Sequence, residues 1–197
     1  SPVMQKMAGN FIFTNEKDVY GSRIIPSRGS WLEFKIEPKK DLIYTIIDRK
    51  KKILGTVFLR ALGFETREEI IRAFYNVETV KIEDTRECRD SLVGRVLADA
   101  ILIKDNDSEE EKILYRAGEK LHPHNIDEIF IHNMSELSLI KFDNKNDPQM
   151  IINCFEKEEI IFSKEGLSEP TKEDAISKVF AAINPGEPIT IETAEKE

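Results

Sequence analysis

Polar and apolar residues alternate over positions 31–37, and this alternation constrains the fold more than any other feature of the sequence. An alternation of period two predicts a half-buried strand, with apolar side chains on one face and charged ones on the other. A turn-forming segment follows at 38–41, and the next run, 42–48, is rich in β-branched and aromatic residues. The two runs predict an antiparallel hairpin. Trp31 falls on its charged face, where the ring is either packed under a loop or left open for stacking.

Helical patterns follow the hairpin and return near the end of the chain. Apolar residues recur at helix spacing over 52–62, and Gly63 stands where a C-terminal cap is expected. A capping-box pattern at 66–69 opens a second short helix, and a last helix is predicted over 171–183. Between 77 and 164 the pattern changes to short strands broken by polar turns. The sequence therefore predicts an α+β fold, in which both chain ends form a hairpin with short helices around an inserted, mostly-β small domain.

The charges are distributed unevenly along the chain. The formal net charge is −8, and this negative balance argues against DNA binding through the overall field. Residues 20–60 nevertheless hold ten basic residues against four acidic ones, a local balance of +6 that leaves −14 for the remainder. The two parts of the chain are therefore expected to have different partners.

Several classes of protein are disfavoured by composition. No apolar run approaches the roughly 20 residues that cross a bilayer, so no membrane partner is expected. Cys88 and Cys154 lie far apart and match no metal spacing, which predicts free thiols in a reducing cytosol. The first ten residues lack the features of a secretory signal and do not begin with Met, which predicts a segment excised from a longer protein.

Catalytic and metal-binding motifs are not found in the sequence. It has no glycine-rich phosphate loop, no nucleophile elbow and no paired histidines on a helix. The cluster of His122, His124 and His132 is interpreted as a surface turn rather than a zinc site. The acidic run 105–111 lacks the central glycine and the terminal glutamate of a calcium loop. We therefore predict no catalytic residue, no metal site and no cofactor in this chain.

A run of four cations, Arg49 to Lys52, ends the predicted hairpin. Such a run concentrates positive potential where a phosphate backbone could lie, although most basic runs are only solvated surfaces. An exposed Trp31 on the same sheet would add base stacking, and stacking beside a basic track holds single strands without reading their sequence. Charge and stacking together favour a nucleic-acid contact here.

Three motifs of this sequence resemble the lobe of the bacterial RNA polymerase beta subunit: RIIPSRGSWLEF at 23–34, IDRKKK at 47–52 and LRALGF at 59–64. NPGEP at 184–188 is similar to the RPGEP of that family and departs from it at Asn184. The resemblance implies a cytoplasmic fragment of DNA-directed RNA polymerase, a nucleotidyltransferase that makes RNA from nucleoside triphosphates in transcription. It implies no catalytic residue in this fragment, because the magnesium of the whole enzyme is bound by the beta-prime subunit.

The same resemblance assigns DNA contacts to the hairpin region. It implies that the lobe forms one jaw of the DNA cleft and faces the nontemplate strand and the downstream duplex. Trp31 matches the tryptophan that stacks against a nontemplate-strand base, and Arg49 and Lys50 match positions along the same DNA path. Lys51 and Arg28 complete the predicted DNA-binding set. The alternative for Arg28 is an ion pair with a carboxylate of the hairpin itself.

The resemblance also divides the chain into domains. Residues 1–76 and 165–197 are assigned to the lobe, and residues 77–164 to an insertion found in many bacterial beta subunits, with looser matches at 92–98 and 113–118. The acidic insertion is expected to lie away from DNA. The alternative function is that the insertion serves as a docking module for sigma factor or transcription regulators. The other expected partners are DNA, the beta-prime subunit and the rest of beta. An independent hydrolase or transferase is disfavoured because no nucleophile and base are recognisable.

Overall fold

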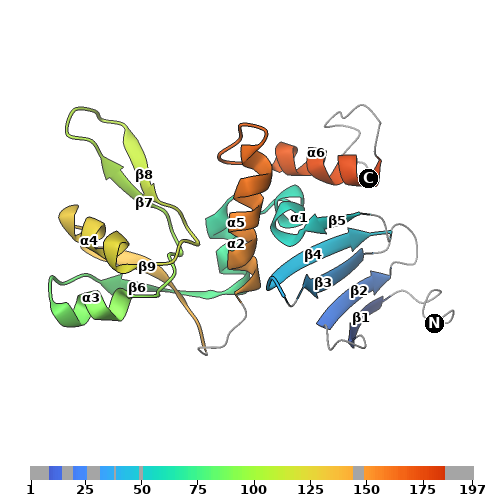
Figure 1. The fold of residues 1–197 in the computed structure, drawn as a ribbon, viewed down its shortest axis with the longest axis horizontal. Helices are drawn as coiled ribbons and strands as arrows, with labels where there is room; N and C mark the ends of the chain where they lie inside the picture. Colours follow the sequence, from blue (N-terminus) through green and yellow to red (C-terminus); the bar gives the residue numbers. More distant parts are fainter. Residues whose placement is uncertain are drawn as a thin grey trace. The chain divides into compact units, whose positions relative to one another are not determined.

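The computed structural model describes residues 9–14, 20–25, 32–37, 39–48, 51–143 and 149–184, with the backbone alone for the first two stretches. The chain divides into two compact units, unit 1 (residues 1–65 and 148–197) and unit 2 (residues 66–147). Both units combine helices with antiparallel strands, which confirms the predicted α+β class (Figure 1). Among the helices so described, none is both long enough and apolar enough to cross a membrane.

Unit 1 is built on a five-stranded antiparallel sheet whose strands lie side by side in sequence order. The strands are β1 (Gly9–Thr14), β2 (Tyr20–Ile25), β3 (Leu32–Glu37), β4 (Leu42–Ile47) and β5 (Lys52–Leu54). The predicted hairpin is confirmed as β3 and β4, which pair from Leu32 opposite Ile47 to Glu37 opposite Leu42. The other three strands extend this hairpin on both sides.

Three helices pack beside this sheet: α1 (Gly55–Ala61), α5 (Met150–Ser163) and α6 (Lys172–Ile183). Figure 1 shows them next to β4 and β5, and α1 contacts both other helices. The helix predicted at 52–62 begins only at Gly55, because Lys52–Leu54 pair with β4 as a strand. Its predicted end is confirmed: Gly63 has a φ of 115°, and the Phe64 N–H donates to the Leu59 carbonyl at 3.1 Å.

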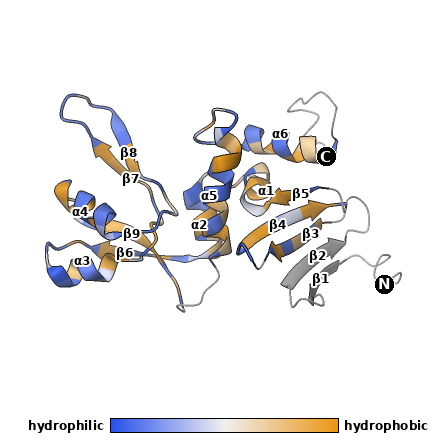
Figure 2. Ribbon diagram, in the orientation of Figure 1, coloured by the Kyte–Doolittle hydropathy of each residue, from blue (hydrophilic) through white to orange (hydrophobic). Residues whose placement is uncertain are grey.

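The core of unit 1 lies between the sheet and these helices, and Figure 2 shows apolar residues along β4. Helix α1 approaches β4 so closely that a Cβ at Gly55 would lie 2.8 Å from Ile43 Cγ2. Glu33 departs from the predicted alternation. It was expected on the charged, solvated face of the strand, but it is only 4% exposed. The core residues are Leu42, Ile53, Leu54, Val57, Phe58, Cys154, Phe162 and Ala175.

The predicted helix starts are confirmed by their caps. At the start of α6, the Thr171 hydroxyl accepts from the Asp174 N–H at 3.2 Å, and the Asp174 carboxylate accepts from the Thr171 N–H at 2.8 Å. In unit 2, the Thr66 hydroxyl accepts from the Glu69 N–H at 3.1 Å where α2 (Arg67–Phe74) begins. Each cap satisfies backbone donors that the first helical turn leaves without partners.

Unit 2 combines two short sheets with three helices. Strand β6 (Asn76–Lys81) pairs with β9 (Glu136–Lys141), and β7 (Ile101–Lys104) pairs with β8 (Glu111–Tyr115). Besides α2, the unit contains α3 (Arg86–Leu92) and α4 (Pro123–Ile131). With α5, residues 77–164 hold more helix than the mostly-β prediction implied. The core residues of the unit are Leu92, Leu97, Ile101, Leu121, Ile126, Ile129, Leu137 and Leu139.

Polar contacts connect helix α2 to the rest of unit 2. The Arg72 guanidinium donates to both carboxylate oxygens of Asp99, at 2.7 and 2.8 Å. Arg67 donates to the Ala117 carbonyl at 3.2 Å, and Glu68 accepts from the Ala100 N–H at 3.3 Å. Helix α2 therefore packs with unit 2 and α5 with unit 1, whereas the predicted domains divide at 76/77 and 164/165. Packing does not report which segment was inserted, so the domain assignment stays a prediction.

The Arg72–Asp99 pair makes unit 2 sensitive to acid. The hydrogen bond from Arg72 outweighs partial burial and lowers the pKa of Asp99 below its ordinary value of 3.8. A lowered folded-state pKa gives stability that is present above 3.8 and is lost as the pH falls through the folded-state pKa. We expect Asp99→Asn to reduce stability by less than about 1 kcal/mol at pH 6, because both side chains are partly solvated, and by less still at pH 3. Urea unfolding at both pH values measures the difference, and an equal loss at both would contradict it.

Candidate nucleic-acid interface

The strand register brings two segments to one end of the sheet in unit 1. Leu32, the first residue of β3, lies opposite Ile47, the last residue of β4, and Ile46 lies opposite Lys52. Trp31 is covalently bonded to Leu32, and residues 48–51 connect β4 to β5. The segment before β3 and the turn after β4 therefore adjoin the same end of the sheet.

Of the five predicted DNA-binding residues, the structure describes one. Lys51 is exposed, and it has no ion-pair partner among the side chains described. Arg28, Trp31, Arg49 and Lys50 lie outside the described residues, so their predicted roles stay predictions.

Asp48 starts the turn that carries the cationic run. Its φ of 50° is in the left-handed region, which Asp adopts more readily than most residues. The side chain is exposed, and Asp48 has turn conformation directly after the last residue of β4. Asp48 thus marks the end of β4 and the beginning of a turn.

Lys52, the last member of the cationic run, is held by the sheet. Its ammonium lies 3.4 Å from a Glu37 carboxylate oxygen and 4.4 Å from the centroid of the Tyr44 ring. The ammonium of Lys40 lies 3.3 Å from the other Glu37 oxygen. Desolvation raises the pKa of Glu37, but the hydrogen bonds from Lys40 and Lys52 outweigh it, so the pKa is lowered. The side chain of Lys52 thus extends along the sheet toward Glu37, and it remains 56% exposed.

Arg60, counted among the basic residues of this region, lies in the core instead. Arg60 and Glu158 are 1% and 2% exposed, and their side chains form an ion pair between α1 and α5. Arg60 also donates to the carbonyl of Glu65 and, at 3.3 Å, to that of Pro170. Its charge is therefore neutralised inside the unit and contributes little to the surface field. No local sequence signal identifies Glu158 as its partner.

The three histidines do not lie together in the structure. The rings of His122 and His124 stack at the start of α4 with centroids 5.8 Å apart, and His132 lies beyond the other end of that helix. Over the described ranges no three His, Cys, Asp or Glu side chains gather as a metal site would require. Cys88 and Cys154 are both free, as predicted, and burial raises the pKa of the Cys154 thiol to about 11.

Comparisons with known proteins show that the chain is similar to part of one enzyme subunit. Residues 4–92 match the family model described as RNA polymerase Rpb2, domain 2. The chain is 50% identical over 190 residues to DNA-directed RNA polymerase subunit beta of Treponema denticola, and 45% identical over 194 and 195 residues to the same subunit of Treponema pallidum and Borreliella burgdorferi. Each alignment covers 94% of this chain and 16% of the relative. The chain thus spans about one sixth of the length of these curated relatives.

Proposed function

Because this chain belongs to the RNA polymerase beta-subunit family, as a segment of about one sixth of such a subunit, we propose that unit 1 is a DNA-holding surface of the assembled enzyme. In this role it forms one jaw of the DNA cleft and contacts the nontemplate strand and the downstream duplex. The chain carries out no chemistry itself; it holds the strands for RNA synthesis by a centre on the beta-prime subunit, which binds the magnesium. The expected location is the cytoplasm.

The observation that carries this proposal is the strand register at one end of the sheet. Leu32 pairs with Ile47, so the chain reaches Trp31 and the 48–51 turn from adjacent strands. An aromatic ring and cations side by side would combine base stacking with phosphate contacts, which is how proteins hold single strands without reading sequence. The exposure of Lys51 in this turn supports the proposal.

The test replaces Trp31 in the assembled polymerase. Stacking contributes roughly 1–3 kcal/mol per base, so Trp31→Ala should shorten the lifetime of open promoter complexes by about 5- to 150-fold. Trp31→Phe keeps an aromatic face and should recover part of the lifetime. The measurement is the decay of open complexes after addition of a competitor. Equal lifetimes for wild type and Trp31→Ala would contradict the proposal.

A second function is favoured by the surface of unit 2. Residues 66–147 contain 19 acidic and 12 basic residues, a balance that repels nucleic acid and suits a basic protein partner. Five large apolar side chains of the unit are exposed, namely Phe74, Val93, Leu102, Ile113 and Ile131. We propose that this unit docks sigma factor or a transcription regulator.

Deleting residues 66–147 from the assembled enzyme should then abolish binding of at least one such protein. Unchanged binding of all of them would overturn the docking role.

A further inference from the structure

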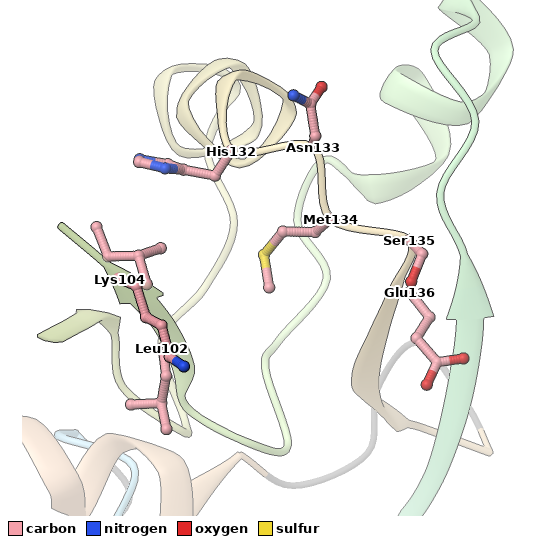
Figure 3. A pocket seen from close by; sticks show the side chains of 8 residues that line it. Leu102, Lys104, His132, Asn133, Met134, Ser135 and Glu136 are labelled. Carbon is pink, nitrogen blue, oxygen red and sulfur yellow. The ribbon is translucent and has the colours of Figure 1, made fainter. Parts of the chain in front are cut away.

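Unit 2 contains an open hollow between β7 and the segment that joins α4 to β9 (Figure 3). The hollow has a volume of about 490 Å³ and is lined by residues 102–104 and 132–136. Met134 is half-buried and points into it, while Asn133 points away (Figure 3). The hollow can thus receive an apolar side chain against Met134 and Leu102.

The hollow arises where two paired segments separate. Leu97 bridges to Leu139, and the Ala98 N–H donates to the Ser138 carbonyl at 2.9 Å, so the chain runs beside β9 up to this point. Beyond it β7 pairs only with β8, and the first two residues of β9 pair only with β6, as far as the described residues show. One edge of each strand is left without a strand partner. A strand edge with unpaired N–H and C=O groups is able to accept another extended chain.

One residue of the lining, Leu102, and two residues close to the lining segments are apolar and exposed. Leu102 lies directly opposite Ile113 in the hairpin, and the two residues are 46% and 51% exposed. Ile131, at the end of α4 next to His132, is 73% exposed. Large apolar side chains that gather on a surface commonly mark a contact with another protein.

The charge around the hollow indicates the chemistry of the partner. Residues 104–112 of the β7–β8 hairpin contain five acids and two lysines. One of those lysines, Lys112, is already held at 2.7 Å by Asp105. The acids of helix α4 do not add to this charge, because Asp127 pairs with Arg89 at 3.0 Å and Glu128 accepts from the Tyr115 hydroxyl. The lining combines Leu102, Ile103 and Met134 with polar residues, and the acidic tip of the hairpin follows directly after Lys104. A segment that is basic and carries an apolar side chain complements these two features.

We infer that this hollow binds an extended, basic segment of another protein, with one large apolar side chain inserted between Leu102 and Met134. The segment runs along the open edge of β7, where main-chain hydrogen bonds supply affinity and the apolar side chain supplies selectivity. Its cationic residues face the acidic hairpin tip. This inference rests on the docking function of unit 2 and names both the place and the class of partner.

The test uses the assembled polymerase and a defined probe, a fluorescent eight-residue peptide of alternating Lys and Leu. Leu102→Arg removes the apolar wall and adds a like charge, so it should weaken peptide binding by about tenfold or more, measured by fluorescence anisotropy. Val93→Arg is the matched control, because Val93 is 50% exposed in the same unit but does not line the hollow. A photo-crosslinking residue at position 102 should capture the peptide, and one at position 93 should not.

Two further peptides distinguish the causes of binding. Alternating Lys and Ser keeps the charge, and alternating Glu and Leu keeps the apolar side chains; both should bind at least about tenfold more weakly. Equal binding of either peptide, or equal weakening by Leu102→Arg and Val93→Arg, overturns the inference. Self-association of the enzyme that Leu102→Arg abolishes would also overturn it, because the occupant would be a second copy. If deletion of residues 66–147 abolishes regulator binding but Leu102→Arg does not weaken peptide binding, the location fails while the docking function survives.

Discussion

Replacing Glu158 with Leu is expected to lower the free energy of unfolding of unit 1 by about 3–5 kcal/mol, because it leaves the Arg60 guanidinium charged and without its carboxylate in the core. Arg60 is 1% exposed, so water cannot take the place of the lost partner. Arg60→Leu should have a similar effect, since Glu158 is then the buried, unpaired charge. The measurement is urea unfolding, with hydrogen exchange of α1 and α5 to assign the loss to unit 1.

The double variant separates a buried charge from a general loss of packing. With both residues changed to Leu, no unpaired charge remains, so the double variant should be more stable than either single variant. Some loss should persist, because the Glu65 and Pro170 carbonyls lose the donor that Arg60 provides. Arg86→Leu is the control, because its ion pair with Asp90 is 3.9 Å long and its side chain is 96% exposed. Losses that simply add in the double variant would contradict the expectation.

Two internal deletions of similar length are expected to have opposite outcomes. Deleting residues 77–164, the predicted insertion, removes α5 and with it Phe155 and Phe162, each only 1% exposed. It also removes the buried partner of Arg60. We expect this variant to lose the cooperative unfolding of unit 1, because each Phe removed from a core costs about 3–5 kcal/mol and whole domains are stable by only about 5–15 kcal/mol.

Deleting residues 66–147 instead, with a short Gly-Ser linker, keeps α5 and should leave unit 1 folded. Circular dichroism and urea unfolding compare the two variants. Retained cooperative unfolding after deletion of 77–164 would show that α5 is dispensable, and loss of folding in both variants would show that unit 1 depends on unit 2. The 66–147 deletion is therefore the appropriate variant for testing docking, because an unfolded unit 1 would abolish binding for an unrelated reason.

Local patterns were sufficient to predict several elements of both units. The alternation at 31–37 predicted β3, and the capping residues Thr66 and Thr171 predicted the starts of α2 and α6. These signals depend only on neighbours within a few residues. Helix α5 was not predicted, because a helix that buries Ile151, Ile152 and Phe155 together has no clear polar and apolar faces. The strand at 52–54 was predicted as helix, because its pairing with β4 is a tertiary contact.

The candidate site was predictable in part. The cationic run was visible in the sequence, but the contacts of Lys52 with Glu37 and Tyr44, which Lys51 does not share, require the register of three strands. The burial of Arg60 was not predictable, because its partner lies on a distant helix. The hollow beside β7 also has no signal in the sequence, since it forms where two chain segments diverge.

The ion pair between Arg60 and Glu158 has a consequence for synthesis of the chain on the ribosome. Glu158 follows Arg60 by about 100 residues. At about 5–20 residues per second, the ribosome therefore adds Glu158 roughly 5–20 s after it adds Arg60. During that interval the sheet and α1 have emerged without their covering helices, and the arginine remains hydrated. Unit 2 is translated in the same interval and can fold first. The nascent subunit is therefore most vulnerable to proteases and to aggregation before α5 emerges, and a chaperone that shields α1 would act in that period.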